Sequence, residues 1–307
     1  MADETVKQPL VISVILNTNR RDDTLACLAS LEKSSYSNLQ TIVLDNASID
    51  GSLDAINRRF PDVTVIPLQE NKGYAGNNNV GIQAALELGA DWVLVLNEDT
   101  IVDEECISKL IQVGEVNSKI GIVGPMVYHY DEPVGIQSAG GWLNSRWESG
   151  HIGLNEADNG QFKQPHPVEW ISGCAILVRR AVIHQIGMLD ERFFYYWEET
   201  EWCLRYRRAG WTIMHVPYAK LWHKGVQRDY KPNPNVTYYN TRNRLMFMKK
   251  HGAPLSAWGY TWYQLVRTYV TWSLLPKWAD MVDHRAAMGQ AILDFLRNRW
   301  GMRHGIH

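Results

Sequence analysis

Residues 92–100 read WVLVLNEDT, five apolar residues followed directly by a polar and acidic group. Two earlier stretches have the same form, since the apolar runs VISVIL (11–16) and TIVL (41–44) lead into Asn17-Thr18-Asn19 and Asp45-Asn46. A continuous apolar run is typical of a strand buried on both faces of a sheet. Ligands of open α/β sheets bind beyond the carboxyl ends of the strands, so the three polar groups predict one shared crevice.

Helical patterns separate these runs. We predict helices over residues 22–33, 52–60 and from the glycine-punctuated loop 71–76 to about residue 88, with a further strand at 63–66. Repeated strand–helix units predict an α/β fold with a Rossmann-like, mostly parallel sheet flanked by helices.

The later part of the chain is less regular. We divide the chain into a catalytic domain, 1–252, and a Trp-rich helical extension, 253–307, broken at Pro276. The nucleotide-binding half of the domain would cover about 9–130, and the acceptor and catalytic half 131–252. Within the latter, 131–167 is predicted as a long loop or small hairpins. Strands are expected at 120–127, 170–178 and 212–216, and helices at 200–208 and 235–250.

Composition restricts the function. With 31 Lys and Arg against 33 Asp and Glu, the formal net charge of -2 predicts no nucleic-acid partner. The four cysteines are far apart and form no CxxC pair, which indicates neither a zinc knuckle nor a disulfide framework. The first eight residues are polar, and no uninterrupted apolar run is long enough to span a membrane. We therefore expect a cytoplasmic protein.

Two polar groups could hold a metal. Carboxylates of Asn97-Glu98-Asp99 could bind Mg²⁺ or Mn²⁺ together with substrate phosphates. The alternative is an ordinary acidic strand-to-loop turn. His223, within LWHKG (221–225), could add a neutral imidazole ligand, although a lone histidine is more often a partly exposed polar residue.

Two loops could bind a nucleotide. Asp45, at the start of DNASIDGS (45–52), could accept from a base N–H or a ribose hydroxyl. The alternative is an Asx turn and helix N-cap, which Ser48 or Asp50 would supply equally well. The glycines of NKGYAGNNN (71–79) permit close backbone approach to a phosphate, although the stretch lacks the ATPase P-loop pattern. A plain polar loop is the alternative.

The densest acidic cluster is WEETEWCLR (197–205), which aromatic residues surround. Burial of Glu198 and Glu199 would raise their pKa values towards the range useful to a general base. The alternative is acidic residues at the positive end of a helix. We favour that alternative for Glu201, with Arg205 as its partner one helical turn later.

The ordered series of these motifs resembles the bacterial family 2 inverting glycosyltransferases, in their rhamnosyltransferase-like branch. The residues that carry the likeness are 11–20, 43–52, NKGYAGNNNVGI (71–82), LNEDT (96–100), ISGCAILVRR (171–180), 188–211, 221–225 and YYNTRNR (238–244). The resemblance implies a GT-A fold, a UDP- or dTDP-sugar donor such as dTDP-rhamnose, a divalent metal and inversion at the anomeric carbon. The acceptor would be a hydroxyl of a glycan or a lipid-linked sugar.

The resemblance also implies residue roles. Asp99 would be the main metal ligand, assisted by His223, with Asn97 standing where a strict DxD motif has Asp. Glu199 would be the catalytic base, in place of the family's Asp, with Glu198 beside it. Arg242 would reach the diphosphate. The donor site would comprise Thr18, Asn19, Arg20, Asp45, Asn46, Lys72, Gly76, Asn78 and Glu98, and the acceptor site Trp170, Ser172, Gly173 and Trp197.

The tail carries an apolar face of Trp258, Trp262, Leu265, Tyr269 and Trp272 at spacings of three and four. We favour packing of this face onto the catalytic domain. The alternative is an interfacial helix that brings the enzyme to a lipid-linked acceptor on the inner face of the membrane.

The residues alone leave two other classes of protein possible. A sugar-1-phosphate nucleotidyltransferase should carry a basic, Gly-rich signature after the first strand, and LNTNR (16–20) does not supply one. A non-catalytic module that binds nucleotide sugars is the second.

Overall fold

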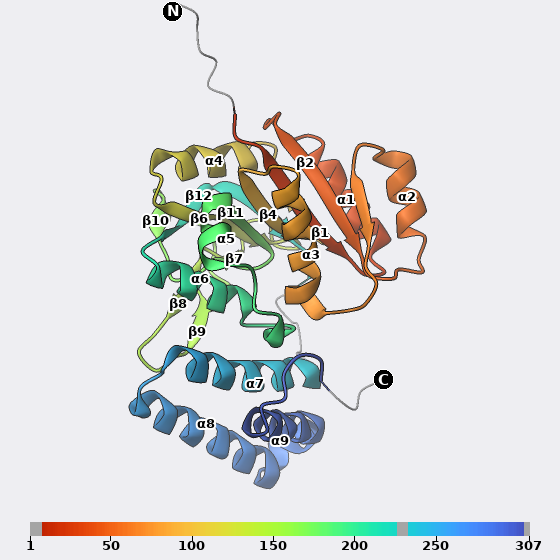
Figure 1. Cartoon of the computed structure of the whole chain (residues 1–307). Coiled ribbons are helices and arrows are strands. Elements are labelled where there is room, and N and C mark those ends of the chain that lie inside the picture. The colour runs from red at the N-terminus through yellow and green to blue at the C-terminus, as the bar shows by residue number, and fades with distance from the viewer. Residues whose placement is uncertain (1–7, 226–232, 304–307) are drawn as a thin grey trace, which may run out of the picture.

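The computed structural model describes residues 8–225 and 233–303, and Figure 1 shows it as one α/β body with a layer of helices beneath. Within these residues a ten-stranded sheet has the order β10-β12-β6-β11-β4-β1-β2-β3, with β5 paired to β12 and β7 to β6. The pairs β1–β2, β1–β4 and β2–β3 are parallel, whereas β11 is antiparallel to β4 and β6. The strands are β1 (Val11–Asn17), β2 (Leu39–Asp45), β3 (Thr64–Pro67), β4 (Trp92–Asn97), β5 (Thr100–Val102), β6 (Ile120–His129), β7 (Ile136–Ser138), β10 (His166–Pro167), β11 (Ala175–Arg179) and β12 (Thr212–His223).

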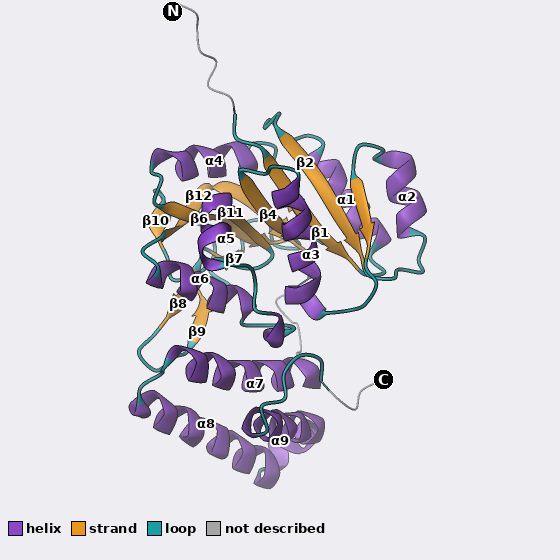
Figure 2. Ribbon diagram, in the orientation of Figure 1, coloured by secondary structure: helices purple, strands orange, loops and turns teal. Residues whose placement is uncertain are grey.

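Helices cover both faces of this sheet, as Figure 2 shows. The helices are α1 (Arg21–Leu31), α2 (Ser52–Arg59), α3 (Gly73–Glu87), α4 (Cys106–Val116), α5 (Arg180–Ile186), α6 (Glu198–Arg208), α7 (Pro234–His251), α8 (Leu255–Leu274) and α9 (Val282–Leu296). Successive side chains of β1 point to opposite faces of the sheet. Val11 and Ile15 lie in one core, which α1 and α4 cover, and Ile12 and Val14 lie in the other, beneath α3, α5 and α6. The predicted mostly parallel α/β sheet with a helical C-terminal region is confirmed.

Some boundaries differ from the prediction. α3 begins at Gly73, so most of the expected loop 71–76 is helix. The side chains of Asn71 and Asn77 accept from the backbone N–H groups of Gly73 and Lys72, each at 2.9 Å, and thereby satisfy the start of the helix. β11 begins only at Ala175, and β12 continues to His223, well beyond the predicted end at 216. Helix α4 was not predicted.

The segment 131–167 contains short strands, as expected from the predicted small hairpins and not from a long loop. β8 (Gly141–Leu143) pairs with β9 (Ser149–His151), and β7 and β10 join the main sheet.

α7, α8 and α9 form the layer beneath the sheet, with α7 nearest to it (Figure 1). Asn233 caps the start of α7, and Gly252 ends it at a φ of 68°, so the predicted boundary at 252 falls between α7 and α8. The 3-10 turn η2 (Pro276–Met281) separates α8 from α9 at the predicted break.

The predicted apolar face of α8 lies against α9 of the extension, whereas we favoured packing onto the catalytic domain. The buried residues of α8 are Ala257 and Thr261, and Tyr269 of the predicted face is 43% exposed. Trp258 lies against Phe295, with ring centroids 6.0 Å apart, and Trp272 lies against His284 at 6.2 Å. The opposite face of α8 is also apolar but exposed. We call it the outer stripe, and it comprises Leu255, Tyr263, Val266, Val270 and Leu274.

Candidate active site

The carboxyl ends of β1, β2 and β4 lie side by side. In the sheet register Asn17 is opposite Asp45, and Leu16 is opposite Asn97. The Nδ2 of Asn17 donates to Oδ1 of Asp45 at 2.8 Å, and the Nδ2 of Asn46 donates to Oγ1 of Thr18 at 3.2 Å. The predicted meeting of these polar groups in one place is therefore confirmed.

The loop after β2 is held by its own side chains as well as being a candidate nucleotide contact. The backbone N–H of Ser48 donates to Oδ2 of the buried Asp45 at 3.1 Å, and Asp50 forms the Asx turn weighed above, since its Oδ1 accepts from the N–H of Ser52 at 3.0 Å. Oδ1 of Asn19 accepts from the N–H of Ile49 at 2.8 Å. These bonds hold Thr18, Asn19 and Asn46 at the mouth of the crevice.

Arg20 links the first strand end to the acidic cluster. Its guanidinium lies 3.9 Å from a carboxylate oxygen of Glu98 and 3.6 Å from one of Asp99. Burial raises the pKa of Glu98 to about 7, and the neighbouring Asp99 charge adds to the rise. Burial also acts to raise the pKa of Asp99, but His223 and Arg20 hold it below its ordinary value. Asp99 is thus the carboxylate that stays ionised.

Asp99 and His223 face each other with a geometry that suits a cation. His223 Nε2 lies 3.0 Å from Asp99 Oδ1, about the separation of two ligands at right angles around an ion ~2.1 Å from each. The buried Oδ1 accepts no well-aligned hydrogen bond. On the far side of the ring, Nδ1 lies 2.8 Å from Oε1 of Gln137, so Nδ1 is the donor in that bond and Nε2 is the ring nitrogen that faces Asp99.

This pair fits a divalent ion but does not enclose it. Among residues 8–225 and 233–303, no group of three or more His, Cys, Asp or Glu side chains is arranged to hold a metal. A Cβ on Gly225 would collide with Oδ2 of Asp99, so glycine keeps the space beside the carboxylate open. Such an open site matches the preference of Mg²⁺ for a few carboxylates plus substrate phosphates.

Glu198 and Glu199 begin α6, where Glu198 is buried and Glu199 is partly buried. Burial raises the pKa of Glu198 well above its ordinary value, and the adjacent Glu199 adds to the rise. Burial also raises the pKa of Glu199, against which the backbone N–H groups of Glu199 and Thr200 act. The Oε2 atom of each glutamate is buried without a hydrogen-bond partner. Because Glu199 receives more amide stabilisation, it is the member that ionises first.

The backbone that leads to this pair is strained. In the segment 193–197, which we call the base loop, Phe194, Tyr196 and Trp197 have φ values of 63°, 69° and 73°. None of the three is glycine, so each conformation is costly on its own. Such a loop persists only where its surroundings hold it.

α7 supplies that support. Nδ2 of the fully buried Asn243 lies within hydrogen-bond distance of the carbonyl oxygens of Phe193, Tyr195 and Tyr196, at 2.8, 2.8 and 2.9 Å. The neighbouring Arg242 donates to the carbonyl oxygens of Phe193 at 3.1 Å and Gly301 at 2.7 Å. Asn243 was not among the predicted site residues.

Arg242 requires a correction, because it was expected to reach the diphosphate. Its side chain is 0% exposed, and its guanidinium is engaged by backbone carbonyls, Tyr238 and Asn243. The structure therefore makes Arg242 a support of the base loop and leaves it no free face for a ligand.

The predicted acceptor residues separate into two groups. Gly173 lies beside Glu199, since a Cβ there would stand 3.7 Å from Cβ of Glu199, and its carbonyl accepts from the hydroxyl of Tyr74. Ser172 adjoins it. Trp170, in contrast, is 4% exposed and donates to the carbonyl of Trp142, so it packs in the core and cannot contact an acceptor. Trp197 lines a cavity described below.

The residues predicted on α3 serve mainly to shape the helix start. Asn78 is buried and donates to the carbonyl of Tyr74 at 2.9 Å, while its Oδ1 has no partner. Lys72 pairs with Glu70 at 3.1 Å on the surface. Gly76 packs so closely that a Cβ would meet Lys72.

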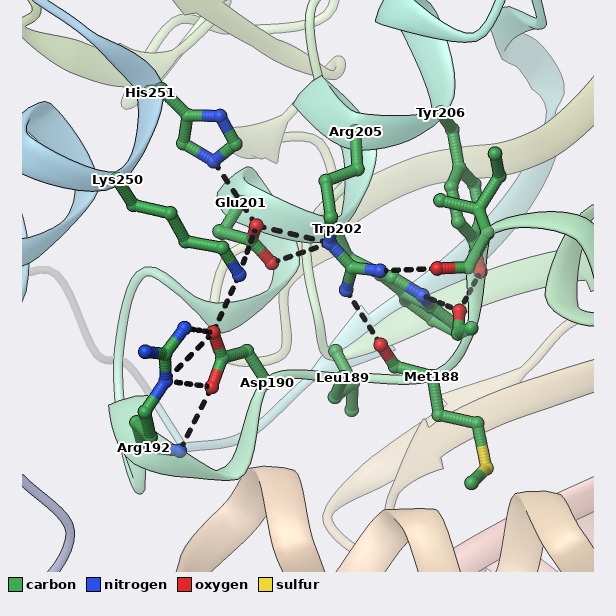
Figure 3. Close-up of polar contacts among 12 residues, drawn as sticks. Met188, Leu189, Asp190, Arg192, Glu201, Trp202, Arg205, Tyr206, Lys250 and His251 are labelled. Atoms are coloured by element: carbon green, nitrogen blue, oxygen red, sulfur yellow. Dashed lines mark hydrogen bonds and ion pairs between the residues drawn. The ribbon is translucent and has the colours of Figure 1, made fainter.

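Glu201 has its own set of charged partners, which Figure 3 shows. Arg205 donates to both of its carboxylate oxygens, at 3.0 and 2.9 Å, and confirms the predicted pairing. Lys250 and His251 of α7 reach the same carboxylate at 2.8 and 3.0 Å. Burial raises the pKa of Glu201, but these partners hold it below its ordinary value. Glu201 therefore stays ionised and fixes α6 to α7.

The site thus combines a polar crevice at the strand ends of an open α/β sheet with an Asp–His pair and a glutamate pair whose Oε2 atoms are buried. The chain belongs to glycosyl transferase family 2, whose model matches residues 13–187. The match covers the predicted nucleotide half and Ser172–Gly173, and ends before Glu198, Glu199 and His223.

Similar proteins agree with this assignment. The chain is 27% identical over 248 residues to an N-acetylglucosaminyl-diphospho-decaprenol L-rhamnosyltransferase of Mycobacterium tuberculosis, which covers 73% of this chain and 79% of the relative. It is 27% identical to the dTDP-rhamnosyl transferase RfbF of Shigella flexneri, over 71% of this chain and 73% of that protein. The rhamnosyltransferase-like branch is confirmed.

A solved structure shares the fold. The mannosyltransferase PcManGT from Pyrobaculum calidifontis, solved in complex with GDP-Man and Mn²⁺, superposes with a TM-score of 0.61 at 14% identity, covering 96% of this chain and 89% of that one. Membership of the family favours sugar transfer over nucleotidyl transfer and over a binding module without catalysis.

Proposed function

We propose that this protein transfers a sugar from a UDP- or dTDP-sugar to a hydroxyl group of a glycan or lipid-linked acceptor, with inversion at the anomeric carbon. dTDP-rhamnose is the leading donor candidate, because two relatives are named as rhamnosyltransferases. The observation that carries the chemistry is the buried Glu198–Glu199 pair beside Gly173, in which one carboxylate is favoured in its ionised form.

Glu199 acts as the general base. Its carboxylate accepts the proton of the acceptor hydroxyl while that oxygen bonds to the anomeric carbon and the bond from this carbon to the diphosphate oxygen breaks. Attack and departure on opposite faces of the sugar invert the centre, by analogy with inverting glycosidases. Glu198 keeps its proton and supports the local structure.

The donor's nucleoside diphosphate would lie along the three strand ends. Thr18, Asn19, Asp45 and Asn46 would meet the nucleoside, with the cavity of about 340 Å³ beside Asn19 and Arg20 at its edge. Lys72, just before α3, and Gly76 and Asn78 on α3 would flank the nucleoside diphosphate.

Asp99 and His223 would hold Mg²⁺ or Mn²⁺ together with the donor's diphosphate oxygens. The ion would supply charge neutralisation for the departing diphosphate. Arg20 and Glu98 orient Asp99 and set the local charge. Asp99→Ala should therefore abolish activity, and His223→Ala should impair it less.

The outer stripe of α8 supports a peripheral contact with the cytoplasmic face of a membrane. α8 carries no acidic residue, and its exposed side includes tyrosine, which is enriched at membrane interfaces. In the described residues no helix is both long and apolar enough to cross a bilayer.

A donor panel tests the proposal. Nucleoside diphosphate released from UDP- and dTDP-sugars is measured with and without acceptor, for the wild type, Glu199→Gln and Glu198→Gln. We expect Glu199→Gln to lower the rate by about 10²–10⁴-fold with little change in donor affinity, the usual contribution of a general base. If Glu199→Gln transfers sugar at nearly the wild-type rate, the base assignment is wrong. If no donor is consumed, the transferase proposal itself fails.

A further inference from the structure

A cavity of about 380 Å³ lies between α7 and α8 and adjoins the base loop. We call it the α7–α8 cavity. One wall is Trp197, the residue directly before Glu198 and Glu199, and another is Leu265 on the inner side of α8. The cavity belongs neither to the strand-end crevice nor to the Asp99–His223 pair. Its contents would therefore lie on the acceptor side of the base.

Arg244 brings a positive charge into this cavity and makes no direct ion pair there. Its side chain is partly buried, and burial lowers the pKa of its guanidinium, against which the charge of the nearby Glu148 acts. It donates only to neutral oxygens, the carbonyls of Trp147 and Arg146 at 3.2 and 3.3 Å and the hydroxyl of Thr261 at 3.2 Å. No carboxylate of the described chain lies within ion-pairing distance of it.

Arg205 has the ion pair that Arg244 lacks. Arg205 is also largely buried, but it pairs with Glu201 at 2.9 Å. A charge taken from water without a partner is costly, and a bound anion would offset that cost. A guanidinium is suited to the oxygens of a phosphate group, which it can engage through two parallel N–H donors.

The rest of the lining indicates the character of the ligand. Asn240 and Thr241 add an amide and a hydroxyl, while Val236, Leu245 and Leu265 make an apolar side. Asn240 already accepts from the indole N–H of Trp197 at 3.1 Å, so its amide N–H₂ group is oriented by that bond. The ligand would thus combine an anionic group with an apolar chain.

α8 connects this cavity to the surface. Its inner side contributes Thr261 and Leu265 to the cavity, and its outer side is the exposed stripe that includes Val266 and Val270. A ligand whose apolar chain lies in a membrane could therefore reach the cavity from the surface that α8 contacts.

We propose that the α7–α8 cavity is the acceptor subsite that binds the diphosphate of a lipid-linked acceptor, with Arg244 as its specificity-determining residue. The assignment rests on the proposed transferase function. With the diphosphate beside Arg244, the sugar attached to it extends past Trp197 towards Glu199. Arg244 selects the acceptor and takes no part in binding the donor.

Calorimetric titration with farnesyl diphosphate, pyrophosphate, farnesol and dTDP tests this proposal on the wild type, Arg244→Gln and Arg267→Gln. Arg267 is exposed on α8 outside the cavity and serves as the matched control. We expect the wild type and Arg267→Gln to bind farnesyl diphosphate more tightly than pyrophosphate or farnesol. Arg244→Gln should bind it about 10- to 100-fold more weakly, as for a lost charge-assisted hydrogen bond. Binding of dTDP should be the same in all three.

Arg244→Lys separates charge from stability, because it keeps the cation without the planar fork. It should bind farnesyl diphosphate with intermediate affinity, and thermal melts should show whether each variant is folded. Equal binding by folded Arg244→Gln, or displacement of farnesyl diphosphate by dTDP, would overturn the inference. Acceptor-independent release of dTDP from a dTDP-sugar is measured in parallel. A normal rate in Arg244→Gln leaves the transferase proposal standing, whatever the binding result.

Discussion

The smallest functional unit is a pair of adjacent side chains with unequal protonation. Glu198 and Glu199 each have a buried Oε2 atom, so they cannot both be charged at low cost. The backbone N–H groups at the start of α6 favour charge on Glu199. One helix terminus thereby produces a base and a neutral neighbour from two identical residues.

This inequality predicts a pH dependence. A carboxyl group with a raised pKa becomes a base only above that pKa, so kcat/KM should fall with decreasing pH already above the ordinary value of 4.5. Glu198→Gln should keep this acid limb nearly in place, because Glu198 is already neutral when Glu199 ionises. pH–rate profiles of the wild type and of Glu198→Gln measure the position of this acid limb. An acid limb that disappears in Glu198→Gln would show that Glu198 is the titrating base.

Gln137 gives a second prediction at this scale, because it accepts from Nδ1 of His223 and so directs Nε2 towards Asp99. Gln137→Leu removes that acceptor. We expect the Mn²⁺ concentration for half-maximal activity to rise about 10–100-fold, the usual effect of losing such a partner.

Gln137→Glu is the matched variant, since it keeps an acceptor at the same place. It should stay close to the wild type in Mn²⁺ activation. If Gln137→Leu needs no more Mn²⁺ than the wild type, His223 is oriented by other contacts.

At the scale of elements, α7 and the base loop act together. The loop has three non-glycine residues with positive φ, and α7 bonds its carbonyl groups through Asn243 and Arg242. Glu201 adds a second connection, because it binds Lys250 and His251 at the far end of α7. The position of the base thus depends on a helix outside the sheet.

Asn243→Ala tests this dependence. It leaves carbonyl groups of the base loop without a donor, which costs about 1–3 kcal/mol of folding stability for a buried group. Because the loop carries the base, kcat should fall at least tenfold while KM for the donor changes little, since about 1 Å of misplacement can cost ~10²-fold.

Asn298→Ala is the control, since Asn298 is exposed and accepts one bond from Lys249. It should match the wild type in kcat and lose only a little thermal stability, since alanine adopts the φ of 52° at this position less readily than asparagine. A donor KM that rises in Asn243→Ala while kcat is unchanged would contradict a role in positioning the base.

Elements with a simple pattern were predictable, and those that depend on distant contacts were not. The runs at 11–16, 41–44 and 92–96 became strands with polar ends in register, because burial on both faces requires continuous apolar sequence. The pairing of Glu201 with Arg205 followed from helical spacing. The glutamate pair stood out by its density and aromatic surroundings.

Arg242 was wrongly assigned to the diphosphate, although its position on the helix already indicated that its side chain is buried. Tyr238, Arg242 and Leu245 share one buried side of α7 at spacings of four and three, so Arg242 points into the protein. Asn243 and Gln137 had no local signal, because their partners lie 47 or more residues away along the chain. The positive φ values of the base loop are likewise set by α7 and not by the loop's own residues.

At the scale of the whole molecule, the helical layer beneath the sheet presents an apolar exterior. Leu255 and Leu274, at the two ends of α8, are 88% and 73% exposed, with Val266 and Val270 between them. Since the inner side of α8 is apolar too, the helix has apolar surface on both sides. A helix of this kind needs a second apolar neighbour.

Vesicle flotation tests whether that neighbour is a membrane. The wild type should float with vesicles that contain phosphatidylglycerol, and a variant with Val266→Asp and Val270→Asp should bind them at least about tenfold more weakly for each lost valine. Both valines are at least 46% exposed, so the fold should be kept.

Val116→Asp is the matched control, because Val116 is 79% exposed at the end of α4, in the catalytic domain. It should float like the wild type. A wild type that stays with the soluble fraction, and elutes from gel filtration as a dimer, would identify a second copy of the chain as the partner of α8.

The contact between Arg242 and Gly301 has a consequence for protein synthesis. Gly301 also donates its N–H to the carbonyl of Arg192 at 3.0 Å, so residue 301 lies against the start of the base loop. A ribosome delivers the strands of the sheet before it delivers residue 301, and domains fold progressively as they emerge. The nascent chain therefore completes its sheet before Gly301 can secure the loop that precedes Glu198. A chain released between these two points would carry the strand-end crevice without a fixed base loop.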